Sequence, residues 1–389
     1  MALAGPGLDL SEIRDAVANV CRRFDDDYWS ACDQEHRFPW DFYTAMAEGG
    51  WVGIAIPEQF GGGGQGIAAA AAVLEEVAAS GACMNGASSV HMSIFGMHPV
   101  VVHGSAEMKE RFLPSVADGS LHVAFGVTEP DAGTDTTKIT TRAVRSDDHY
   151  IVNGRKVWTS KALEADRILL LTRTTPLADC RRPVDGMTLF LVDRHSPGVG
   201  AVAIDKMGRN AVASCETTYE DVIVPLADRV GEEGQGFRYL LDGLNAERIL
   251  IAAEAVGIGR AALRRAVAYA CDRVVFDRPI GKNQGISFPL AQAHAQLRAA
   301  ELMIAEAAQL IDAGRPCGEE ANLAKYLAAE AGFFAADRAV QTHGGFGYAV
   351  EYHVERYFRE ARLPRIAPIS QELILAYVAE HVLGLPRSH

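Results

Sequence analysis

The segment from residue 125 to residue 135 carries side chains whose types and spacing suit the binding of a flat heteroaromatic ring. Its pattern predicts a strand that runs into a Pro/Gly turn, where backbone N–H groups and two threonine hydroxyls are presented together. Small polar groups of this kind allow a ring edge with carbonyl and N–H groups to approach closely. The same turn is also typical of an ordinary surface loop. The segment reads Phe125-Gly126-Val127-Thr128-Glu129-Pro130-Asp131-Ala132-Gly133-Thr134-Asp135.

A second segment, residues 153–160, follows within thirty residues and adds a large aromatic side chain. The Asn153-Gly154 pair stands between strand-like runs and predicts a hairpin turn. Trp158, followed by the hydroxyl residues Thr159 and Ser160, could stack on a flat ring and hydrogen-bond its edge. A core tryptophan beside a loop is the alternative interpretation of the same residues.

The elements that must position these segments change in character along the chain. The hydrophobic period predicts helices first, then strands, then helices again. We therefore expect an α+β fold with an N-terminal helical domain at 1–122, a central β-barrel or sandwich at 123–230 and a C-terminal four-helix bundle at 231–389. The expected helices are 10–24, 39–49, 67–79 and 106–117, then 237–272, 288–313, 319–342 and 371–382; the expected strands are 149–158, 168–172, 187–193 and 217–224.

Together the two segments resemble the acyl-CoA dehydrogenase family. The family's flavin loop, T-E-P-x-A-G-S-D, is matched at 128–135, with Thr134 in the serine place. Its second motif, N-G-x-K-x-W-I-T, is matched at 153–160, with Ser160 in the threonine place. The resemblance extends over about residues 10–385 and implies bound FAD, with Thr134 also near the substrate. The flavin contacts that it implies are Phe125, Val127, Thr128, Gly133, Thr134, Trp158, Thr159 and Ser160.

The C-terminal part of the chain extends this resemblance to the adenosine diphosphate end of FAD. Residues 272–284 are similar to the family's R-x-x-F-G…Q segment, although Asp277 stands where the family usually has Gly. Residues 341–347 resemble Q-x-x-G-G-x-G, whose glycines let backbone amides approach a pyrophosphate. In relatives these groups reach FAD held by a neighbouring subunit, and because relatives are homotetramers, the resemblance implies a homotetramer. The cofactor contacts implied here are Arg273, Phe276, Gln284, Gln341, Gly344, Gly345 and, before the last helix, Ser370.

The reaction that the resemblance implies needs a carboxylate to remove a proton α to a thioester carbonyl. Many relatives carry this glutamate in a Y-E-G-T segment, but the aligned position in this sequence is Pro368. The isovaleryl and long-chain branches instead place it on the first long C-terminal helix, directly before an arginine. Glu247 stands at that position and Arg248 follows it. A Glu-Arg pair on a helix is usually solvated. However, this sequence lacks a carboxylate at position 368 and has one at position 247, which favours Glu247 as the base. Arg248 is then expected to support the substrate side.

The predicted function is therefore FAD-dependent α,β-dehydrogenation of an acyl thioester. Glu247 takes the α-proton, and the β-hydrogen leaves as hydride to flavin N5. The thioester handle is either coenzyme A or an acyl carrier protein, and an electron-transfer flavoprotein or similar carrier is the expected acceptor. Two alternatives remain open from the sequence: a flavin monooxygenase or oxidase on the same scaffold, and a non-catalytic flavin-bearing interaction protein.

The bulk composition argues against several other classes. A net charge of −13 makes a nucleic-acid partner unexpected. The seven cysteines lack metal-ligand spacing. His91, His98 and His103 are irregularly spaced with no evident acidic partner, so we interpret them as satisfied, partly buried histidines and expect no metal. Residues 1–6 lack the features of a signal peptide, and no uninterrupted apolar run approaches about 18 residues. The expected location is the cytoplasm, without a membrane.

Overall fold

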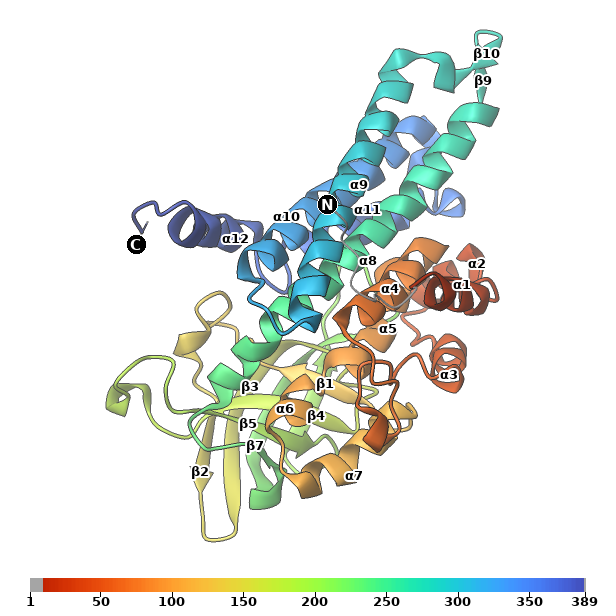
Figure 1. Cartoon of the computed structure of the whole chain (residues 1–389). Coiled ribbons are helices and arrows are strands. Elements are labelled where there is room, and N and C mark those ends of the chain that lie inside the picture. The colour runs from red at the N-terminus through yellow and green to blue at the C-terminus, as the bar shows by residue number, and fades with distance from the viewer. Residues whose placement is uncertain (1–9, 388–389) are drawn as a thin grey trace.

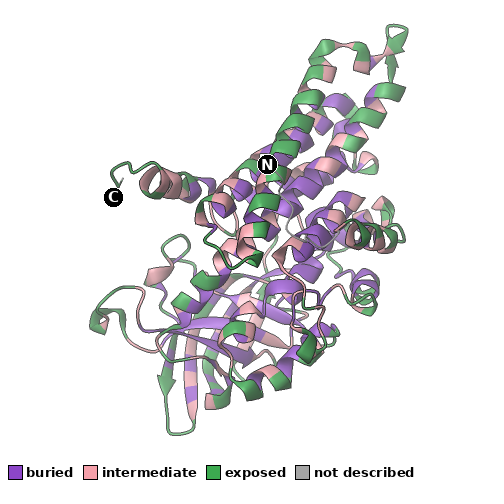
Figure 2. Ribbon diagram, viewed as in Figure 1, coloured by how far each residue is buried: buried purple, intermediate pink, exposed green. Residues whose placement is uncertain are grey.

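The computed structural model describes residues 10–387. Figure 1 shows the β-sheet at one end of the molecule and the long C-terminal helices rising away from it, with the N-terminal helices packed at their junction. Residues 1–6, from which the absence of a signal peptide was inferred, lie outside the described residues. Figure 2 shows that buried residues lie where the helices and the sheet pack against one another, whereas the tip of the long helices is exposed.

The N-terminal helices surround a core made largely of alanine and valine. The helices expected at 10–24, 39–49, 67–79 and 106–117 are present with slightly different ends, and α2, α5 and α6 were not predicted. All residues of α5 except Met92 are buried, so it shows no polar face to mark it as an amphipathic helix. The helices are α1 (Leu10–Cys21), α2 (Asp26–Gln34), α3 (Trp40–Glu48), α4 (Ile67–Val77), α5 (Cys83–Phe95), α6 (His98–His103) and α7 (Ala106–Ala117).

One helical run in the described residues, Ile67–His103, is long and apolar enough by composition to cross a membrane. It comprises α4, a π turn at Ala78–Ala82, α5 and α6. Inside the protein, 78% of its apolar window is buried. Its hydropathy is therefore accounted for by its place in the protein core.

The central part forms one mixed sheet, with eight strands among residues 10–387. The strand order is β6-β7-β3-β2-β4-β5-β8, and β1 pairs parallel with β4. The sheet thus places the strand before the first motif close to the strand that carries the second. The strands are β1 (Val123–Gly126), β2 (Arg142–Arg145), β3 (His149–Ser160), β4 (Arg167–Arg173), β5 (Met187–Asp193), β6 (Val199–Ala203), β7 (Ser214–Pro225) and β8 (Arg229–Val230).

The hairpin turn predicted at Asn153-Gly154 is wrong, because β3 runs through it without reversing. The register between β3 and β7 shifts at this point, as in a β-bulge. The Asn153 side chain exchanges two hydrogen bonds of 2.9 Å with Asp221 of β7. A Cβ on Gly154 would lie 2.5 Å from Thr141 Oγ1. The Asn-Gly pair therefore serves a close strand contact instead of a turn.

The C-terminal helices pack closely because small residues face one another. A Cβ on Gly332 of α10 would lie 2.4 Å from the carbonyl oxygen of Ala255 of α8. α11 packs on α8 and α10, whereas α12 points away from the long helices (Figure 1). The expected helix at 371–382 is α12 followed by a π turn. The elements are α8 (Gly236–Asp272), β9 (Val274–Val275), β10 (Arg278–Pro279), α9 (Gln284–Asp312), α10 (Gly318–His343), α11 (Val354–Ala361) and α12 (Gln371–Tyr377).

Candidate active site

The structure brings the two central motifs into direct contact. The backbone N–H of Val157 donates to the carbonyl oxygen of Thr128 at 2.9 Å. Lys156 Nζ donates to the carbonyl oxygen of Val127, also at 2.9 Å. The turn after β1 is thereby fixed to β3, and the two segments form a single surface.

A buried ion pair lies beneath this surface and was not assigned a role from the sequence. Lys156 Nζ lies 2.8 Å from Glu129 Oε1, and both side chains are almost fully buried. The Glu129 carboxylate also accepts the backbone N–H groups of Thr140 and Thr141 at 2.7 and 2.9 Å. Burial alone would raise the pKa of Glu129, but Lys156 and these hydrogen bonds outweigh it and lower the pKa to about 2. The Glu129 carboxylate therefore connects the start of this loop with the segment that follows it at Thr140 and Thr141, and with β3.

Trp158 lies on the exposed side of the second motif. Its backbone has a φ of 62°, at a register irregularity between β3 and β7, and 55% of the residue is exposed. Such a large exposed ring is available for stacking. Thr159 is fully buried, with its hydroxyl 3.3 Å from that of Thr217, which leaves only its backbone for a ligand. Ser160 is partly buried, and its hydroxyl accepts a hydrogen bond from Arg209 Nη2 at 3.0 Å.

The loop that faces Trp158 is accessible at its tip. Gly133 and Thr134 are exposed, and nothing lies within 4 Å of a Cβ placed on Gly133. Phe125 is partly buried at the end of β1. Together these residues leave a shallow polar surface with an aromatic side, which fits the flat ring of a flavin.

The C-terminal motifs meet at the far end of α8. Arg273, Gly344 and Gly345 line one cavity of about 600 Å³. An arginine fork and exposed glycine backbone are groups that bind a pyrophosphate. The cavity also contains aromatic side chains, of which Tyr269 stacks on His343 at a centroid distance of 4.2 Å. The remaining residues expected at this end, Phe276, Gln284 and Gln341, are exposed around it.

Asp277, which stands where the family usually has glycine, lies in a turn that suits either residue. Phe276 and Asp277 form the tip of the β9–β10 hairpin, with φ angles of 52° and 62°. A two-residue hairpin turn of this type needs positive φ at both positions, and aspartate tolerates it better than most residues. Phe276 is 93% exposed at this tip.

The two sets of flavin-binding candidates lie near opposite ends of α8 in the folded chain. α8 begins against β5, where a Cβ on Gly236 would lie 2.6 Å from the Leu189 nitrogen, and it ends next to Arg273. Its 37 residues span about 55 Å at 1.5 Å per residue. Figure 1 shows the β9–β10 hairpin at the tip of the long helices, remote from the sheet. A single chain therefore does not bring the two sets together.

Glu247 lies on α8 where this helix crosses α5 and α6. A Cβ on Gly243, one turn earlier, would be 3.2 Å from His98 Cδ2 and 3.5 Å from Phe95 Cζ. The Glu247 side chain is 25% exposed, and its Oε2 lies 2.8 Å from His91 Nε2. The position combines partial access with close contact to the N-terminal helices, as a base at a cleft requires.

His91 has two acidic partners, so the expectation that none was present is wrong. Its Nδ1 lies 2.7 Å from Oε1 of Glu254, while its Nε2 contacts Glu247. Burial would lower the pKa of His91, but the charges and hydrogen bonds of Glu247 and Glu254 outweigh it and raise the pKa well above the usual range. His103 also pairs with a carboxylate, Asp242, at 2.9 Å. Both glutamates are visible in the sequence of α8, but α5 was not predicted as a helix, so His91 could not be placed opposite them.

A mostly apolar cavity of about 230 Å³ lies beside α5 and α6. Phe95 and His98 line it, and both also lie close to Gly243, one turn before Glu247 on α8. Met97 and Ile94 extend the apolar lining, whereas Glu247 is not part of it. A cavity with this lining suits an apolar group.

Arg248 and Ser370 have clear structural contacts. Arg248 Nη1 donates to Asn245 Oδ1 at 2.8 Å, and its buried Nε has no hydrogen-bond partner among the described residues. The Ser370 hydroxyl accepts from the N–H of Leu373 at 3.3 Å and caps α12. Lys325 Nζ donates to the carbonyl oxygen of Ile369 at 2.6 Å and holds the loop that contains Pro368. A polar ligand near Arg248 would satisfy its free donor.

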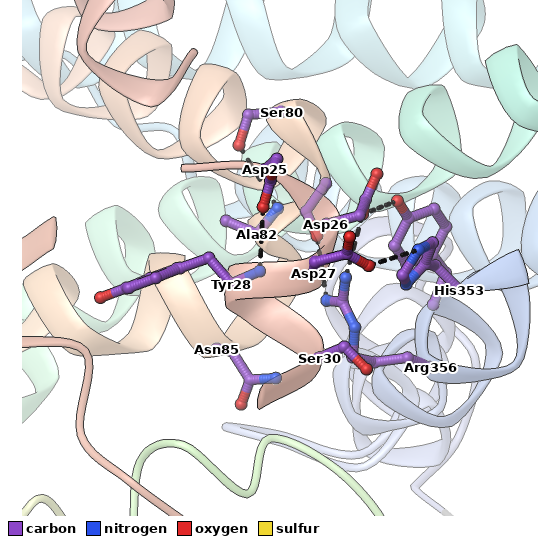
Figure 3. A network of polar contacts seen from close by, with 12 residues as sticks. Asp25, Asp26, Asp27, Tyr28, Ser30, Ser80, Ala82, Asn85, His353 and Arg356 are labelled. Atoms are coloured by element: carbon purple, nitrogen blue, oxygen red, sulfur yellow. Dashed lines mark hydrogen bonds and ion pairs between the residues drawn. The ribbon is translucent and has the colours of Figure 1, made fainter. Parts of the chain in front are cut away.

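A network of polar contacts fixes α5, and with it His91, against the C-terminal helices. Asn85 at the start of α5 donates from its backbone and side chain to Glu360 of α11, at 3.0 and 2.7 Å. Figure 3 shows that Asp26 of α2 points toward Arg356 of α11, at 3.1 Å. Arg356 Nη1 in turn donates to the carbonyl oxygen of Gly81, just before α5, at 2.9 Å. The helix that carries His91 is thus held at its N-terminal end by charged groups from two other helices.

Comparison with known proteins shows which family this chain resembles. The family models for the N-terminal, middle and C-terminal domains of acyl-CoA dehydrogenase match residues 9–120, 124–222 and 234–383. Acyl-CoA dehydrogenase FadE12 of Mycobacterium tuberculosis is 40% identical over 380 residues, which cover 97% of this chain and 96% of that protein.

Similar proteins from other sources extend the match. An acyl-CoA dehydrogenase of Bacillus subtilis is 35% identical over 353 residues, 90% of this chain and 92% of the relative. The solved structure of glutaryl-coenzyme A dehydrogenase with glutaryl-CoA superposes with a TM-score of 0.94 at 30% identity, covering 100% of this chain and 98% of that one. The chain therefore belongs to the acyl-CoA dehydrogenase family of flavin-dependent oxidoreductases.

Proposed function

We propose that this protein is an FAD-dependent α,β-dehydrogenase of acyl thioesters in which Glu247 is the catalytic base. The observation that carries the proposal is the position of the Glu247 carboxylate, which is partly exposed on α8 and lies 2.8 Å from His91. The residue at the family's more usual base position is Pro368, which cannot accept a proton. Glu247 supplies the carboxylate that the reaction requires as its base.

The residues around the proposed flavin site fit the cofactor. The exposed Trp158 ring offers a stacking surface, and the Ser160 hydroxyl and the backbone of Gly133 and Thr134 offer polar contacts at close approach. When bound there, FAD accepts the hydride equivalent that leaves the β-carbon.

The adenosine diphosphate end of the same FAD would lie in the cavity of Arg273, Gly344 and Gly345 of a second copy of the chain. We infer this from the separation of the two sets of residues along α8, which one chain cannot bridge. The assembly that follows is a homo-oligomer, and we propose a homotetramer by analogy with the family.

The chain's own part in the reaction is proton removal. One oxygen of Glu247, Oε2, is held by His91 at 2.8 Å, and we assign its Oε1 to the substrate. Oε1 takes the proton as the Cα–H bond breaks. The electron pair left on Cα becomes part of the new Cα=Cβ bond as hydrogen leaves Cβ with its own pair. Arg248, with its free Nε, and Thr134 are placed to support the substrate side.

The partners follow from this chemistry. The thioester is carried by coenzyme A or by an acyl carrier protein, and an electron-transfer flavoprotein or a similar carrier reoxidises the enzyme. The net charge of −13 argues against nucleic acid. We propose a cytoplasmic location without membrane attachment.

The test is anaerobic mixing of the purified flavoprotein with a panel of acyl-CoA and acyl carrier protein thioesters. The expected result is bleaching of the flavin absorbance by at least one thioester and release of the enoyl product. Absence of bleaching, together with turnover that depends on oxygen and external reduced flavin, would instead identify a monooxygenase. Absence of any reaction with the panel would contradict the enzymatic assignment.

A further inference from the structure

His91 lies between two carboxylates that belong to one face of α8. Glu247 and Glu254 are seven residues apart, which places them two helical turns apart on the same side. The imidazole of His91 spans this interval from α5, at 2.8 Å from Glu247 and 2.7 Å from Glu254. The three side chains form a continuous hydrogen-bonded chain, which we call the Glu–His–Glu clamp.

Burial decreases along the clamp from its inner to its outer end. Glu254 is fully buried and His91 is 5% exposed, whereas the Glu247 side chain is 25% exposed. Only the outer carboxylate is therefore accessible to a ligand. Glu254 is not accessible to a ligand, and its carboxylate contacts His91.

We infer that His91, anchored by Glu254, is a positioning residue that fixes the Glu247 carboxylate with Oε1 directed to the substrate. The inference rests on the proposed function, in which Glu247 is the base. A glutamate side chain on a helix has several rotamers, and a carboxylate in the wrong one cannot reach the α-proton. A donor at a fixed position selects one of them and leaves the second oxygen free.

The clamp has rigid support on the α5 side. Asn85, earlier on the same helix, is bonded to Glu360 of α11 and, at 3.1 Å, to Asp33 of α2. Lys161 Nζ donates at 3.1 Å to the carbonyl oxygen of Ser89, two residues before His91. These contacts hold the backbone on which the imidazole is mounted, so the position of its Nε2 is defined before substrate arrives.

The charges around the clamp favour a protonated imidazole. Glu247 and Glu254 face it from α8. Arg209, from the segment before β7, interacts with the Glu254 charge. Burial would lower the pKa of His91, but the two carboxylates outweigh it and raise the pKa well above its usual range. Both ring nitrogens therefore donate, one to each carboxylate.

The test measures proton removal apart from hydride transfer. An acyl-CoA without hydrogen on its β-carbon cannot be oxidised, but its α-protons exchange with deuterated water when the base acts. The holoenzyme, His91→Gln and the double variant His91→Phe/Glu254→Leu are compared by NMR. The double variant replaces the inner pair with apolar groups, so neither His91 nor Glu254 is left buried without its partner, and Arg209 keeps its hydrogen bonds to Ser160 and Ser214. His103→Gln, which removes a comparable histidine–carboxylate contact outside the clamp, is the control.

The expected result is a loss of α-exchange and of kcat by about 10- to 100-fold in both clamp variants, with little change in KM. His103→Gln keeps the parental rate. Flavin content and melting temperature establish that each variant is folded.

Two results separate this inference from the proposed function. Parental exchange rates in the clamp variants, with exchange abolished in Glu247→Gln, would overturn the role of His91 and leave the base assignment standing. Parental exchange in Glu247→Gln would overturn the base assignment and, with it, the clamp. A fall in kcat that accompanies a raised KM, a lower flavin content and a lower melting temperature would reduce His91 to a structural residue and also contradict the inference.

Discussion

Glu129 and Lys156 come from two different motifs and form a 2.8 Å ion pair that is almost completely buried. Glu129 belongs to the turn after β1, and Lys156 belongs to β3. The pair fixes the loop tip with Gly133 and Thr134 relative to Trp158, so the proposed flavin surface depends on a contact beneath it. The buried pair, the division of the proposed flavin site between two copies, the turn at Phe276-Asp277 and the proposed base can each be tested.

Lys156→Met should destabilise the protein because it leaves the Glu129 carboxylate buried without its partner. The expected loss is about 3–5 kcal/mol in the free energy of unfolding, with a lower flavin content. Chemical denaturation followed by circular dichroism measures it. Arg155→Met, which breaks the exposed 3.3 Å pair with Glu216, should cost less than about 1 kcal/mol. Equal losses in both variants would contradict the importance of the buried pair.

The same pair predicts an acid-dependent stability. The folded-state pKa of Glu129 is lowered from 4.5 to about 2, so its contribution is complete above pH 4.5 and is lost as the pH falls toward 2. This difference corresponds to about 3 kcal/mol. The pKa of Lys156, lowered by burial to about 8, keeps that group charged throughout this window. The stability of the parent minus that of Glu129→Gln should therefore shrink as the pH falls from 4.5, and a difference independent of pH would refute the assignment.

The two ends of the proposed flavin site should complement each other between copies. Trp158→Ala and Arg273→Ala should each yield protein with reduced flavin content but an unchanged fold, since both side chains are exposed. When the two variants are co-expressed with different tags, hybrid assemblies should regain flavin, because one copy supplies an intact Trp158 and the other an intact Arg273. Flavin absorbance of doubly purified hybrids measures this. Hybrids without regained flavin would contradict a site shared between copies.

The turn at Phe276-Asp277 makes a prediction about the departure from the family's glycine. Asp277→Gly should keep the melting temperature and the flavin content, because glycine adopts a φ of 62° without strain. Asp277→Val should lower flavin retention, since a β-branched residue there costs about 1–2 kcal/mol and displaces the exposed Phe276 ring. Equal behaviour of the two variants would show that the turn geometry does not matter for the cofactor.

The sequence predicted the general order of elements because apolar periodicity changes from helical to strand-like and back. The strands at Ile168–Thr172 and Met187–Asp193 lie inside β4 and β5, since their long apolar runs are buried on both faces. The long helix expected from Phe237 is α8 with one more residue at its start. Such predictions succeed where burial of one segment determines its own pattern.

Local signals failed where a distant contact determines the structure. Asn153-Gly154 has the composition of a turn, but its pairing with Asp221 and the crowding against Thr141 keep β3 extended. α5 has no polar face to reveal it, and without α5 the partner of Glu247 and Glu254 could not be found. Glu247 could be proposed as the base from the sequence, because that proposal depends only on its place before Arg248 and on Pro368 at the aligned position. The imidazole that holds it is 156 positions away, and only the packing of α5 on α8 reveals it.

The most direct measurement of the central claim is the rate of anaerobic flavin reduction by a thioester substrate in Glu247→Gln. Glutamine keeps the size of the side chain but cannot accept the α-proton, so the rate should fall by about 10²- to 10⁴-fold with normal flavin content. Asp242→Asn, on the exposed part of the same helix, should leave the rate unchanged. Introducing Pro368→Glu into Glu247→Gln tests whether a carboxylate at the family's more usual position restores reduction. Reduction of the flavin in Glu247→Gln at close to the parental rate would contradict Glu247 as the base.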